Sequence, residues 1–296
     1  MTKLENLVLT HSKYVALGGN ADKKAVQAVL DEITDEVLAG LTPDEICRHV
    51  QEVYDATVDE YIKNPHNKDI IDELIVFMSM LPDEARVYDI GCGPGRDTFF
   101  MSIADEEYRK SQMCRVKNGK TTLEKFSVPT KVFEVVGIDS APEMIGLAFS
   151  KELKLRANRL LPEDVLTFPY LLQKDMHDPH LEGFGPFDAI WSCTALFTHT
   201  PRAQLFPAME SVARILKNNG IFFASYTSGR VDGRYDKLLL SSTGRIKYFS
   251  QPDPDEIAKI AQTCGLKLEK ELFSDFEVGG KVLKKDLFVS QFFRKI

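Results

Sequence analysis

Residues 86–97, R-V-Y-D-I-G-C-G-P-G-R-D, decide the fold of this chain. A short apolar run that contains Asp89 leads into glycines at every second position, Gly91, Gly93 and Gly95. Glycine lets the backbone turn with positive φ at the carboxyl end of a strand, and it lets a ligand approach the main chain without a Cβ in the way. We therefore expect a buried strand, a loop that seats a ligand, and then a helix.

Apolar runs and helical segments alternate along the rest of the chain. We expect further strands at 132–138, 171–172, 187–193, 221–226, 266–273 and 287–293, with a turn at Asn218-Asn219-Gly220 before the fifth strand. Strands that alternate with helices indicate an α/β fold, that is, a mostly parallel sheet with helices on both faces. The last two predicted strands are separated by a short loop, which favours an antiparallel pair.

The segment before residue 82 is predicted to be helical. An apolar stripe runs through 26–38 and ends at Gly40, Thr42-Pro43-Asp44-Glu45 has the pattern of a capping box, and a third helix spans about 69–81. We divide the chain into an N-terminal helical region, 1–81, and a main domain, 82–296. A lid over a site and simple packing against the sheet both remain open for the first region.

Residues 105–131 form a polar insertion, rich in Lys and Arg, between the first two strands. A solvated surface excursion is favoured over a substrate arm.

Charge and cysteine usage limit the function classes. The net charge of −7 disfavours a polyanionic partner, so nucleic acid is an unlikely substrate. The five cysteines are scattered and form no C-x-x-C pair, which indicates reduced thiols and a cytoplasmic location. No apolar run approaches transmembrane length, so we expect no membrane association.

Asp139 ends the second predicted strand, in register with the glycine loop. A carboxylate at this position is where a ribose diol would be held. The alternative is that Asp139 caps the helix from Ala141 onward; Ser140 could do so instead and leave Asp139 for the ligand.

Together these elements resemble the class I S-adenosylmethionine-dependent methyltransferases from about Leu74 to the C-terminus. V-Y-D-I-G-C-G-P-G is similar to the first motif of that family, Asp139 to its second-strand acid, and F-D-A-I-W at 187–191 to its fourth-strand motif. The resemblance implies a Rossmann-like seven-stranded sheet whose last strand is antiparallel. It also implies S-adenosyl-L-methionine as cofactor and S-adenosyl-L-homocysteine as product. The implied cofactor-binding residues are Asp89, Gly91, Cys92, Gly93, Gly95, Asp97, Asp139, Ser140, Asp175, Met176 and Ser192.

A nicotinamide dinucleotide is the rival ligand for the glycine loop. That fingerprint requires G-x-G-x-x-G and a helix that faces a pyrophosphate, whereas Pro94 interrupts this loop and Asp97 would repel phosphate. A cationic methyl donor suits the acidic surroundings better.

His199, in the loop after the fourth strand, is the predicted catalytic base, and a loop-orienting or helix-capping role is the alternative. The cluster of Asp and His at 175–180 could suggest a metal, but a loop beside the adenine explains it better, so we expect no metal. Phe197, Tyr226, Arg234 and Tyr235 are candidates for the acceptor side.

We expect an enzyme that transfers a methyl group to a small-molecule acceptor. The alternatives are a methyltransferase for RNA or protein that docks through 109–131, and a non-catalytic S-adenosylmethionine-binding protein. The identity of the acceptor and the oligomeric state stay open.

Overall fold

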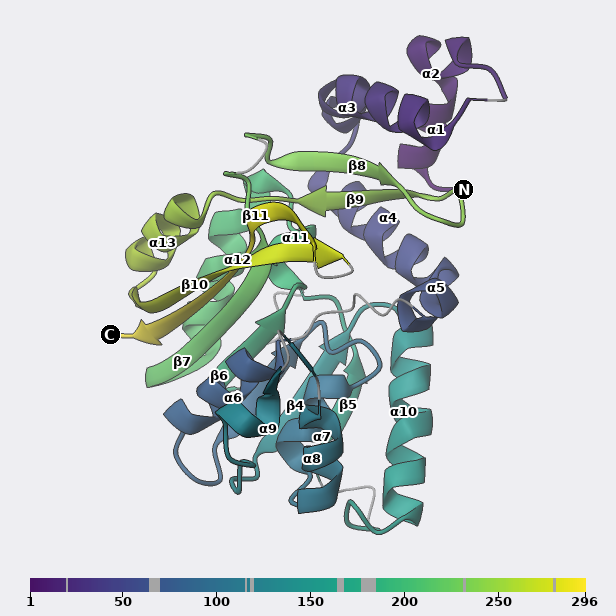
Figure 1. The fold of residues 1–296 in the computed structure, drawn as a ribbon. Coiled ribbons are helices and arrows are strands. Elements are labelled where there is room, and N and C mark those ends of the chain that lie inside the picture. The colour runs from purple at the N-terminus through teal and green to yellow at the C-terminus, as the bar shows by residue number, and fades with distance from the viewer. Residues whose placement is uncertain are drawn as a thin grey trace.

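The computed structural model describes residues 1–19, 21–63, 70–114, 116–117, 120–163, 168–176, 185–230, 233–278 and 281–296. Within these residues, seven strands form one sheet in the order β10-β11-β7-β6-β1-β4-β5 (Figure 1). Their bounds are β1 Arg86–Ile90, β4 Glu134–Asp139, β5 Tyr170–Gln173, β6 Phe187–Cys193, β7 Leu216–Thr227, β10 Leu266–Val278 and β11 Lys281–Lys295.

Strand directions follow the predicted fold class. β1 pairs in parallel with β4 and β6, and the β4–β5 and β6–β7 pairs are also parallel. β11 is antiparallel to both of its neighbours, β7 and β10. The prediction of a Rossmann-like, mostly parallel sheet with an antiparallel last strand is confirmed. The carboxyl ends of β1, β4 and β6 meet at one edge, which is where the glycine loop lies.

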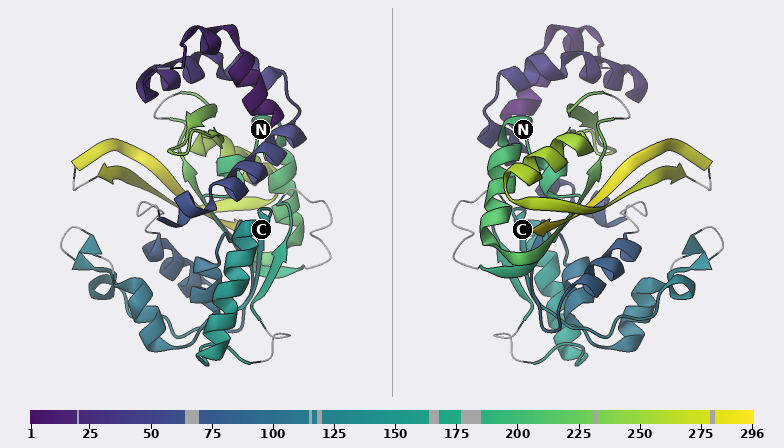
Figure 2. Two further views of the ribbon diagram at one scale, coloured as in Figure 1. Left: turned by 90° about the vertical axis from the view of Figure 1, so that its right-hand side faces the viewer. Right: turned by 90° about the vertical axis from the view of Figure 1, so that its left-hand side faces the viewer.

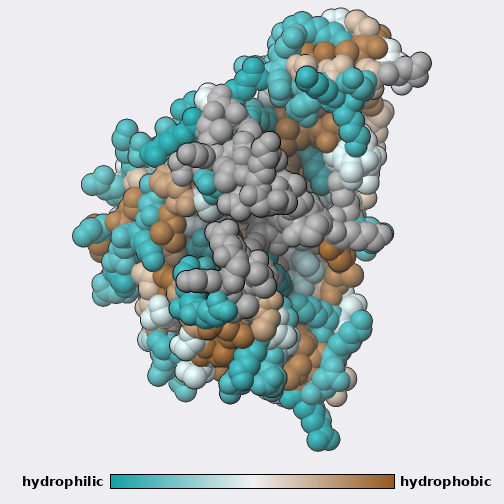
Figure 3. Space-filling model, viewed as in Figure 1, coloured by the Kyte–Doolittle hydropathy of each residue, from teal (hydrophilic) through white to brown (hydrophobic). Residues whose placement is uncertain are grey.

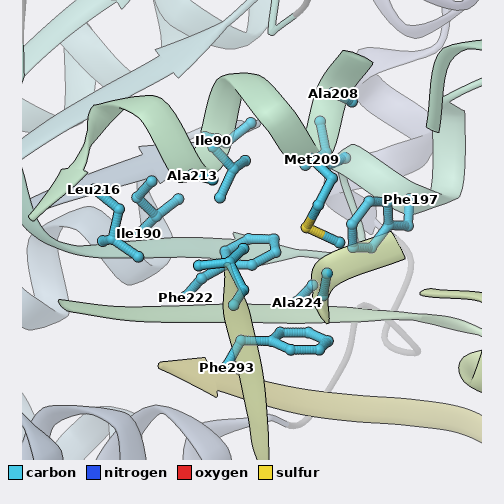
Figure 4. Packing of buried hydrophobic residues seen from close by; sticks show 14 of the residues in the cluster. Ile90, Ile190, Phe197, Ala208, Met209, Ala213, Leu216, Phe222, Ala224 and Phe293 are labelled. Carbon is cyan, nitrogen blue, oxygen red and sulfur yellow. The ribbon is translucent and has the colours of Figure 1, made fainter. Parts of the chain in front are cut away.

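Helices cover both faces of the sheet, as alternating strands and helices require. α12 (Leu205–Ile215) and α13 (Pro254–Thr263) pack on one face through an apolar cluster, part of which Figure 4 shows between α12 and the strands. On the other face, α6 (Ile71–Met80) and α7 (Arg96–Ser102) pack against Trp191 and Phe223, and α10 (Pro142–Ala157) packs beside α7.

The remaining N-terminal helices lie above the carboxyl edge of the sheet with a hairpin from much later in the chain (Figures 1 and 2). They are α1 Lys3–Thr10, α2 Ser12–Ala16, α3 Lys23–Ala39, α4 Pro43–Ala56 and α5 Val58–Lys63, and the hairpin is β8 Asp236–Leu240 with β9 Ile246–Ser250. Leu238, Ile246 and Tyr248 share one apolar cluster with the helices. We call α1–α5 with β8–β9 the cap.

The contacts cross the division that the sequence predicted at residues 81 and 82. α6 lies before it yet packs on the sheet, whereas β8 and β9 lie after it yet pack with the N-terminal helices. The hairpin was not predicted, because an isolated two-stranded hairpin is marginal and its buried face needs partners that lie about 200 residues away in the chain.

The capping box at Thr42 is present: the Thr42 hydroxyl accepts from Glu45 N, and the Glu45 carboxylate accepts from Thr42 N. The predicted turn at Asn218-Asn219-Gly220 is wrong. β7 already begins at Leu216, and the pairing with β6 shifts register between Phe187 and Ala189. The extra residues form an irregularity within the strand, and Asn219 takes positive φ there.

The insertion at 105–131 contains α8 Glu106–Met113, β2 Val116–Lys117, β3 Lys120–Thr121 and α9 Thr122–Lys125. Arg109 is fully buried, and its guanidinium donates to the carbonyls of Pro129 and Lys131 at 2.5 and 2.7 Å. The insertion therefore folds onto the body of the protein. No helix in the described part of the chain has the length and apolar character that crossing a membrane requires.

Candidate active site

The three glycines of the loop have different roles, although each has positive φ. A Cβ on Gly91 would lie 2.2 Å from the Cβ of Ala195, and one on Gly95 would lie 2.5 Å from the ring of Phe99. A Cβ on Gly93 would meet only the Tyr61 hydroxyl, at 3.9 Å. Packing therefore requires glycine at the first and third positions, and the second faces open space.

The amides of the loop are used within the protein. Cys92 N donates to the Ile138 carbonyl at 2.8 Å, Gly93 N to Asp139 Oδ2 at 3.0 Å, and Gly95 N to the Cys92 carbonyl at 3.0 Å. A loop that cradles phosphate needs such N–H groups for its ligand. Because these N–H groups already donate hydrogen bonds within the protein, the loop is suited to a ligand that carries no phosphate.

A cavity lies between the loop and the cap. The cap contributes Val50, Gln51, Tyr54 and Tyr61, and the sheet edge contributes Gly91, Gly93, Asp139, Ser140, Ala141, Met144, Met176, Cys193, Thr194, Ala195 and His199. We call it the cap cavity. Residues from the start, the middle and the second half of the chain thus line one space.

A second, more open cavity of about 990 Å³ adjoins the first and shares Tyr61, Gly91 and Cys193 with it. Its other lining residues are Ile62, Asp89, Cys92, Pro94, Arg96, Asp97, Leu147 and Lys151. We call it the loop cavity. Because the anionic Asp97 and the cationic Arg96 and Lys151 line it, it suits a ligand end that carries both signs of charge.

Asp139 lies in the cap cavity and holds the loop and α10 together. Its Oδ2 accepts from Gly93 N, and its Oδ1 accepts from Ala141 N at 2.9 Å. The hypothesis that Ser140 would replace Asp139 as the cap is therefore wrong. A carboxylate has about four acceptor sites, so two remain for a ligand diol. Burial raises the pKa of Asp139 to about 6.

A polar network lies under the loop. Thr98 donates its hydroxyl to Asp89 Oδ2 at 2.5 Å, while Asp97 accepts from Arg96 Nε at 2.6 Å and from Trp191 Nε1 at 2.9 Å. Burial, and then the charge of Asp97, raise the pKa of Asp89 to about 8. The side chains that line the loop cavity are thus held in place before any ligand binds.

His199 ends α11 (Leu196–His199), a single helical turn where the sequence predicted a loop. Ser192 Oγ accepts from Leu196 N at 3.0 Å and so supports the start of this turn. The His199 ring lies between the rings of Tyr54, 5.0 Å away, and Phe249 of β9, 5.5 Å away. Only 6% of His199 is exposed, and it lines the cap cavity.

The structure brings most of the predicted site residues together. Gly91, Gly93, Asp139, Ser140, Met176 and His199 line the cap cavity, and Asp89, Cys92 and Asp97 join Gly91 in the loop cavity. Gly95, Asp175 and Ser192 are not among the described lining residues of either cavity.

The four acceptor-side candidates lie outside both cavities. Phe197 and Tyr226 are buried in the core, where the Tyr226 hydroxyl donates to Gln291 Oε1 at 2.6 Å. Arg234 donates to the Asp31 carbonyl, and Tyr235 donates to the Thr200 carbonyl. The interpretation of these residues as an acceptor wall is not supported by their placement.

Residues 177–180 of the Asp and His cluster lie outside the described residues. Within the ranges that the structure describes, no group of three His, Cys, Asp or Glu side chains could hold a metal ion.

The sequence left a lid over the site open for the N-terminal helices, but it did not identify which of their residues would line the site. Tyr54 and Tyr61 belong to the apolar stripe of the predicted second helix and were not singled out as site residues. Lys151 lies on α10, where nothing in its sequence neighbourhood marks it. The available signal was the presence of two tyrosines on a helix face that is otherwise aliphatic.

Comparison with known proteins agrees with this geometry. Residues 118–224 match the family described as a methyltransferase domain, a span that contains β4 to β6 and most of β7. A search of curated proteins finds no match to this chain.

Solved structures of the same fold cover most of the chain. One is the 1,6-didemethyltoxoflavin-N1-methyltransferase of Burkholderia thailandensis, with TM-score 0.54, 15% identity, and coverage of 86% of this chain and 91% of that one. Another is the magnesium protoporphyrin IX methyltransferase of Synechocystis PCC 6803, with TM-score 0.52, 13% identity, and coverage of 85% and 100%. A third is the [4+2]-cyclase SpnF, with TM-score 0.54, 12% identity, and coverage of 84% and 96%.

Identities this low show a shared fold, and the fold by itself does not fix the reaction. The matched domain, the strand order with its antiparallel β11, and a glycine loop without phosphate-binding amides point the same way. Residues 118–224 are therefore a methyltransferase domain by their match, and the chain as a whole has the fold of the solved S-adenosylmethionine-dependent methyltransferases.

Proposed function

We propose that this enzyme binds S-adenosylmethionine across the cap cavity and the loop cavity and methylates a small-molecule acceptor beneath the cap. The observation that carries the proposal is the cap cavity itself. Asp139, at the carboxyl edge of the sheet, shares that cavity with His199 and with Tyr54 of the cap. A donor-binding acid and a candidate base thus line a single space that is closed from above.

The two ends of the donor fit the two cavities by their chemistry. The ribose diol suits the remaining acceptor sites of Asp139, and the thioether side chains of Met144 and Met176 suit the faces of an adenine ring. The amino-acid end suits the loop cavity, where Lys151 and Arg96 can attract its carboxylate while Asp97 attracts its ammonium. Lys151 Nζ lies 5.0 Å from the centroid of the Phe99 ring. This contact orients the Lys151 side chain at the loop cavity.

Bound S-adenosylmethionine supplies an electrophilic methyl group on a cationic sulfur. What the chain supplies is alignment and the exclusion of water, which can lower a barrier by about 7–11 kcal/mol. Tyr54 and Tyr61 cover the space above Gly93 from the cap side. His199, held between two rings, is the group that can accept a proton from an acceptor hydroxyl or ammonium.

Two observations support a small-molecule acceptor. The cap covers the cavity, and similar folds occur in enzymes that are named for small-molecule substrates. The toxoflavin-precursor and magnesium protoporphyrin methyltransferases both act, by their names, on small molecules. The alternative of an RNA or protein substrate depended on 109–131 as a docking arm. Arg109, the first basic residue of that arm, is buried and bound to backbone carbonyls, which disfavours the alternative.

The third reading is a non-catalytic S-adenosylmethionine-binding protein. The fold alone does not exclude it, because a similar fold also occurs in a protein named for a reaction other than methyl transfer, the [4+2]-cyclase SpnF. The intact glycine loop and the presence of His199 in the donor cavity favour methyl transfer. We also propose a cytoplasmic location, because the five cysteines are scattered in the sequence and form no C-x-x-C pair.

Labelled methyl transfer tests the proposed function. The protein is incubated with S-adenosylmethionine that carries a tritiated methyl group and with a cell extract, which is then divided by a filter that retains macromolecules. We expect label in the filtrate, dependent on the enzyme, and none above background in the retained RNA and protein. Label in the retained fraction alone would assign the enzyme to the macromolecular class.

A further inference from the structure

Asp55, in the last turn of α4, joins the cap to the donor-binding half of the molecule. Its Oδ1 accepts a hydrogen bond from Glu143 N at 2.9 Å. Glu143 lies in the first turn of α10, the helix that follows Asp139 directly. In Figure 1, α4 runs down from the β8–β9 hairpin, and α5 lies at the upper end of α10.

α10 has no side-chain cap from its own N-cap residue, Ala141. The first amides of a helix need partners from outside the helical pattern. Asp139 takes the amide of Ala141 at 2.9 Å, and Asp55 takes the amide of Glu143. The start of α10 is therefore shared between the proposed ribose acid and a carboxylate of the cap.

The middle of α4 is fixed to the hairpin through His49. Burial lowers the pKa of His49 to about 4, so its ring is neutral. Nε2 then donates to the Ile246 carbonyl of β9 at 2.9 Å, and Nδ1 accepts from the Thr2 hydroxyl at 2.7 Å. α4 thus spans the distance from the cap hairpin to α10 as one rigid element.

Tyr54, the residue before Asp55, contacts the part of the site that contains His199. Tyr54 lines the cap cavity and packs edge to face on the His199 ring, 5.0 Å away. A shift of α4 would move the contact with His199 and the bond to Glu143 together.

We propose that Asp55 is a positioning residue that holds the cap closed by capping α10 from α4, and thereby couples donor binding at Asp139 to closure over His199. The identity of the donor in this statement rests on the proposed function. The closure itself does not, because it concerns contacts within the chain.

Three variants separate the roles of Asp55. Asp55→Ala removes the bond to Glu143 N, whereas Asp55→Asn keeps an amide oxygen that can accept it. Glu52→Ala, an exposed position on the same helix, is the matched control. Unfolding temperatures of all variants are recorded alongside.

The first readout is the alkylation rate of Cys193 by iodoacetamide in the ligand-free protein, followed by peptide mapping. Cys193 lines both cavities, whereas Cys264 lies in a separate surface pocket with residues of α12, so Cys264 is the reference for changes away from the cap. Asp55→Ala should accelerate alkylation of Cys193 about fivefold, which corresponds to about 1 kcal/mol, the usual effect of a lost N-cap. The rate at Cys264 should stay unchanged.

The second readout is the dissociation rate of S-adenosylhomocysteine, followed by the fluorescence of Trp191, which contacts Asp97. Dissociation should be faster in Asp55→Ala by a similar factor, and Asp55→Asn and Glu52→Ala should stay within about twofold of wild type.

Two results would overturn the inference. One is wild-type alkylation of Cys193 in Asp55→Ala, and the other is an equal rise at Cys193 and Cys264, which would indicate general loosening. Failure of wild-type protein to bind S-adenosylhomocysteine would instead contradict the proposed function, and the alkylation result would still decide the role of Asp55.

Discussion

Asp139 is the central residue of the proposed donor site. The sequence located it correctly at the end of the second strand, since a register argument needs only the strand pattern. The sequence also offered the bond to Ala141 N as an alternative role, but it could not predict the bond to Gly93 N, because that bond depends on how the loop folds against β4. Asp139 is therefore a structural link between the loop and α10 in addition to its proposed role as a ligand acceptor.

Donor affinity should depend on pH through Asp139. Burial raises its pKa to about 6, so the carboxylate takes up a proton as the pH falls below that value and loses acceptor capacity. Asp89 stays protonated between pH 5 and 7 because its pKa is about 8. Calorimetry should find S-adenosylhomocysteine affinity about tenfold weaker at pH 5 than at pH 7.

Asp139→Asn is the control for this titration. Its affinity should be low and nearly independent of pH over the same range. An equal pH dependence in the variant would assign the titration to another group.

His199 should affect turnover and leave donor binding intact. His199→Gln keeps a polar side chain but has no group that titrates near neutral pH, so turnover of an acceptor found in the filtrate should fall by about 100-fold or more. Affinity for S-adenosylhomocysteine, measured by calorimetry, should stay within about twofold. Wild-type turnover would limit His199 to its packing between Tyr54 and Phe249.

At the scale of elements, the sequence predicted the strands well wherever an apolar run lies between buried helices. β6 begins and ends where its apolar pattern does, at Phe187 and Cys193. Prediction from the sequence failed where an element depends on partners that are far away in the chain. The hairpin β8–β9 has its buried face on helices from the start of the chain, and the irregular start of β7 depends on its pairing with β6.

The glycine loop offers a matched pair of substitutions. Gly91→Ala would force a Cβ to within 2.2 Å of the Ala195 Cβ, so we expect a protein that is severely destabilised. Gly93→Ala has room and suffers only the cost of a left-handed backbone, about 1–2 kcal/mol. Thermal unfolding should rank wild type first, Gly93→Ala second and Gly91→Ala last.

Ligand binding should separate the two loop variants further. Gly93→Ala should fold yet bind S-adenosylhomocysteine weakly, because its methyl group enters the cap cavity. Undiminished affinity would mean that the ligand does not approach the second glycine.

At the scale of the whole molecule, the cap brings together two segments that are far apart in the chain. They are α1–α5 and the β8–β9 hairpin, which follows about 200 residues later. Figure 2 shows the N-terminal helices above the sheet, next to the hairpin, with the β10–β11 pair extending to one side. The face in Figure 3 mixes hydrophilic and hydrophobic residues, and hydrophilic residues protrude at its lower right, where α10 ends. The cap is a second, smaller layer built on the methyltransferase sheet.

A partly buried ion pair holds the two parts of the cap together. Arg245 donates to Glu5 through Nε at 2.5 Å and Nη2 at 3.1 Å, and Glu5 is only 5% exposed. Glu5→Gln should weaken the cap by about 1–2 kcal/mol. Hydrogen exchange at pH 7 should then increase in 3–10 and 236–250 together, while β1 keeps its protection.

The effect of Glu5→Gln should depend on pH with a definite sign. Burial acts to raise the pKa of Glu5, but the hydrogen bonds from Arg245 and Thr2 outweigh it, so the pKa lies below its ordinary value of 4.5. The stabilisation is present above pH 4.5 and is lost as the pH falls through the lower, folded-state value. Lys13→Ala, which breaks an exposed pair with Glu32, should change little at any pH.

The central claim is that the two adjoining cavities seat a cationic, phosphate-free methyl donor. Calorimetric titration of the wild-type protein with S-adenosylmethionine, S-adenosylhomocysteine and NADH tests it most directly. We predict one binding site for each of the first two ligands and no heat of binding for NADH. Binding of NADH with no binding of either adenosyl compound would contradict the claim.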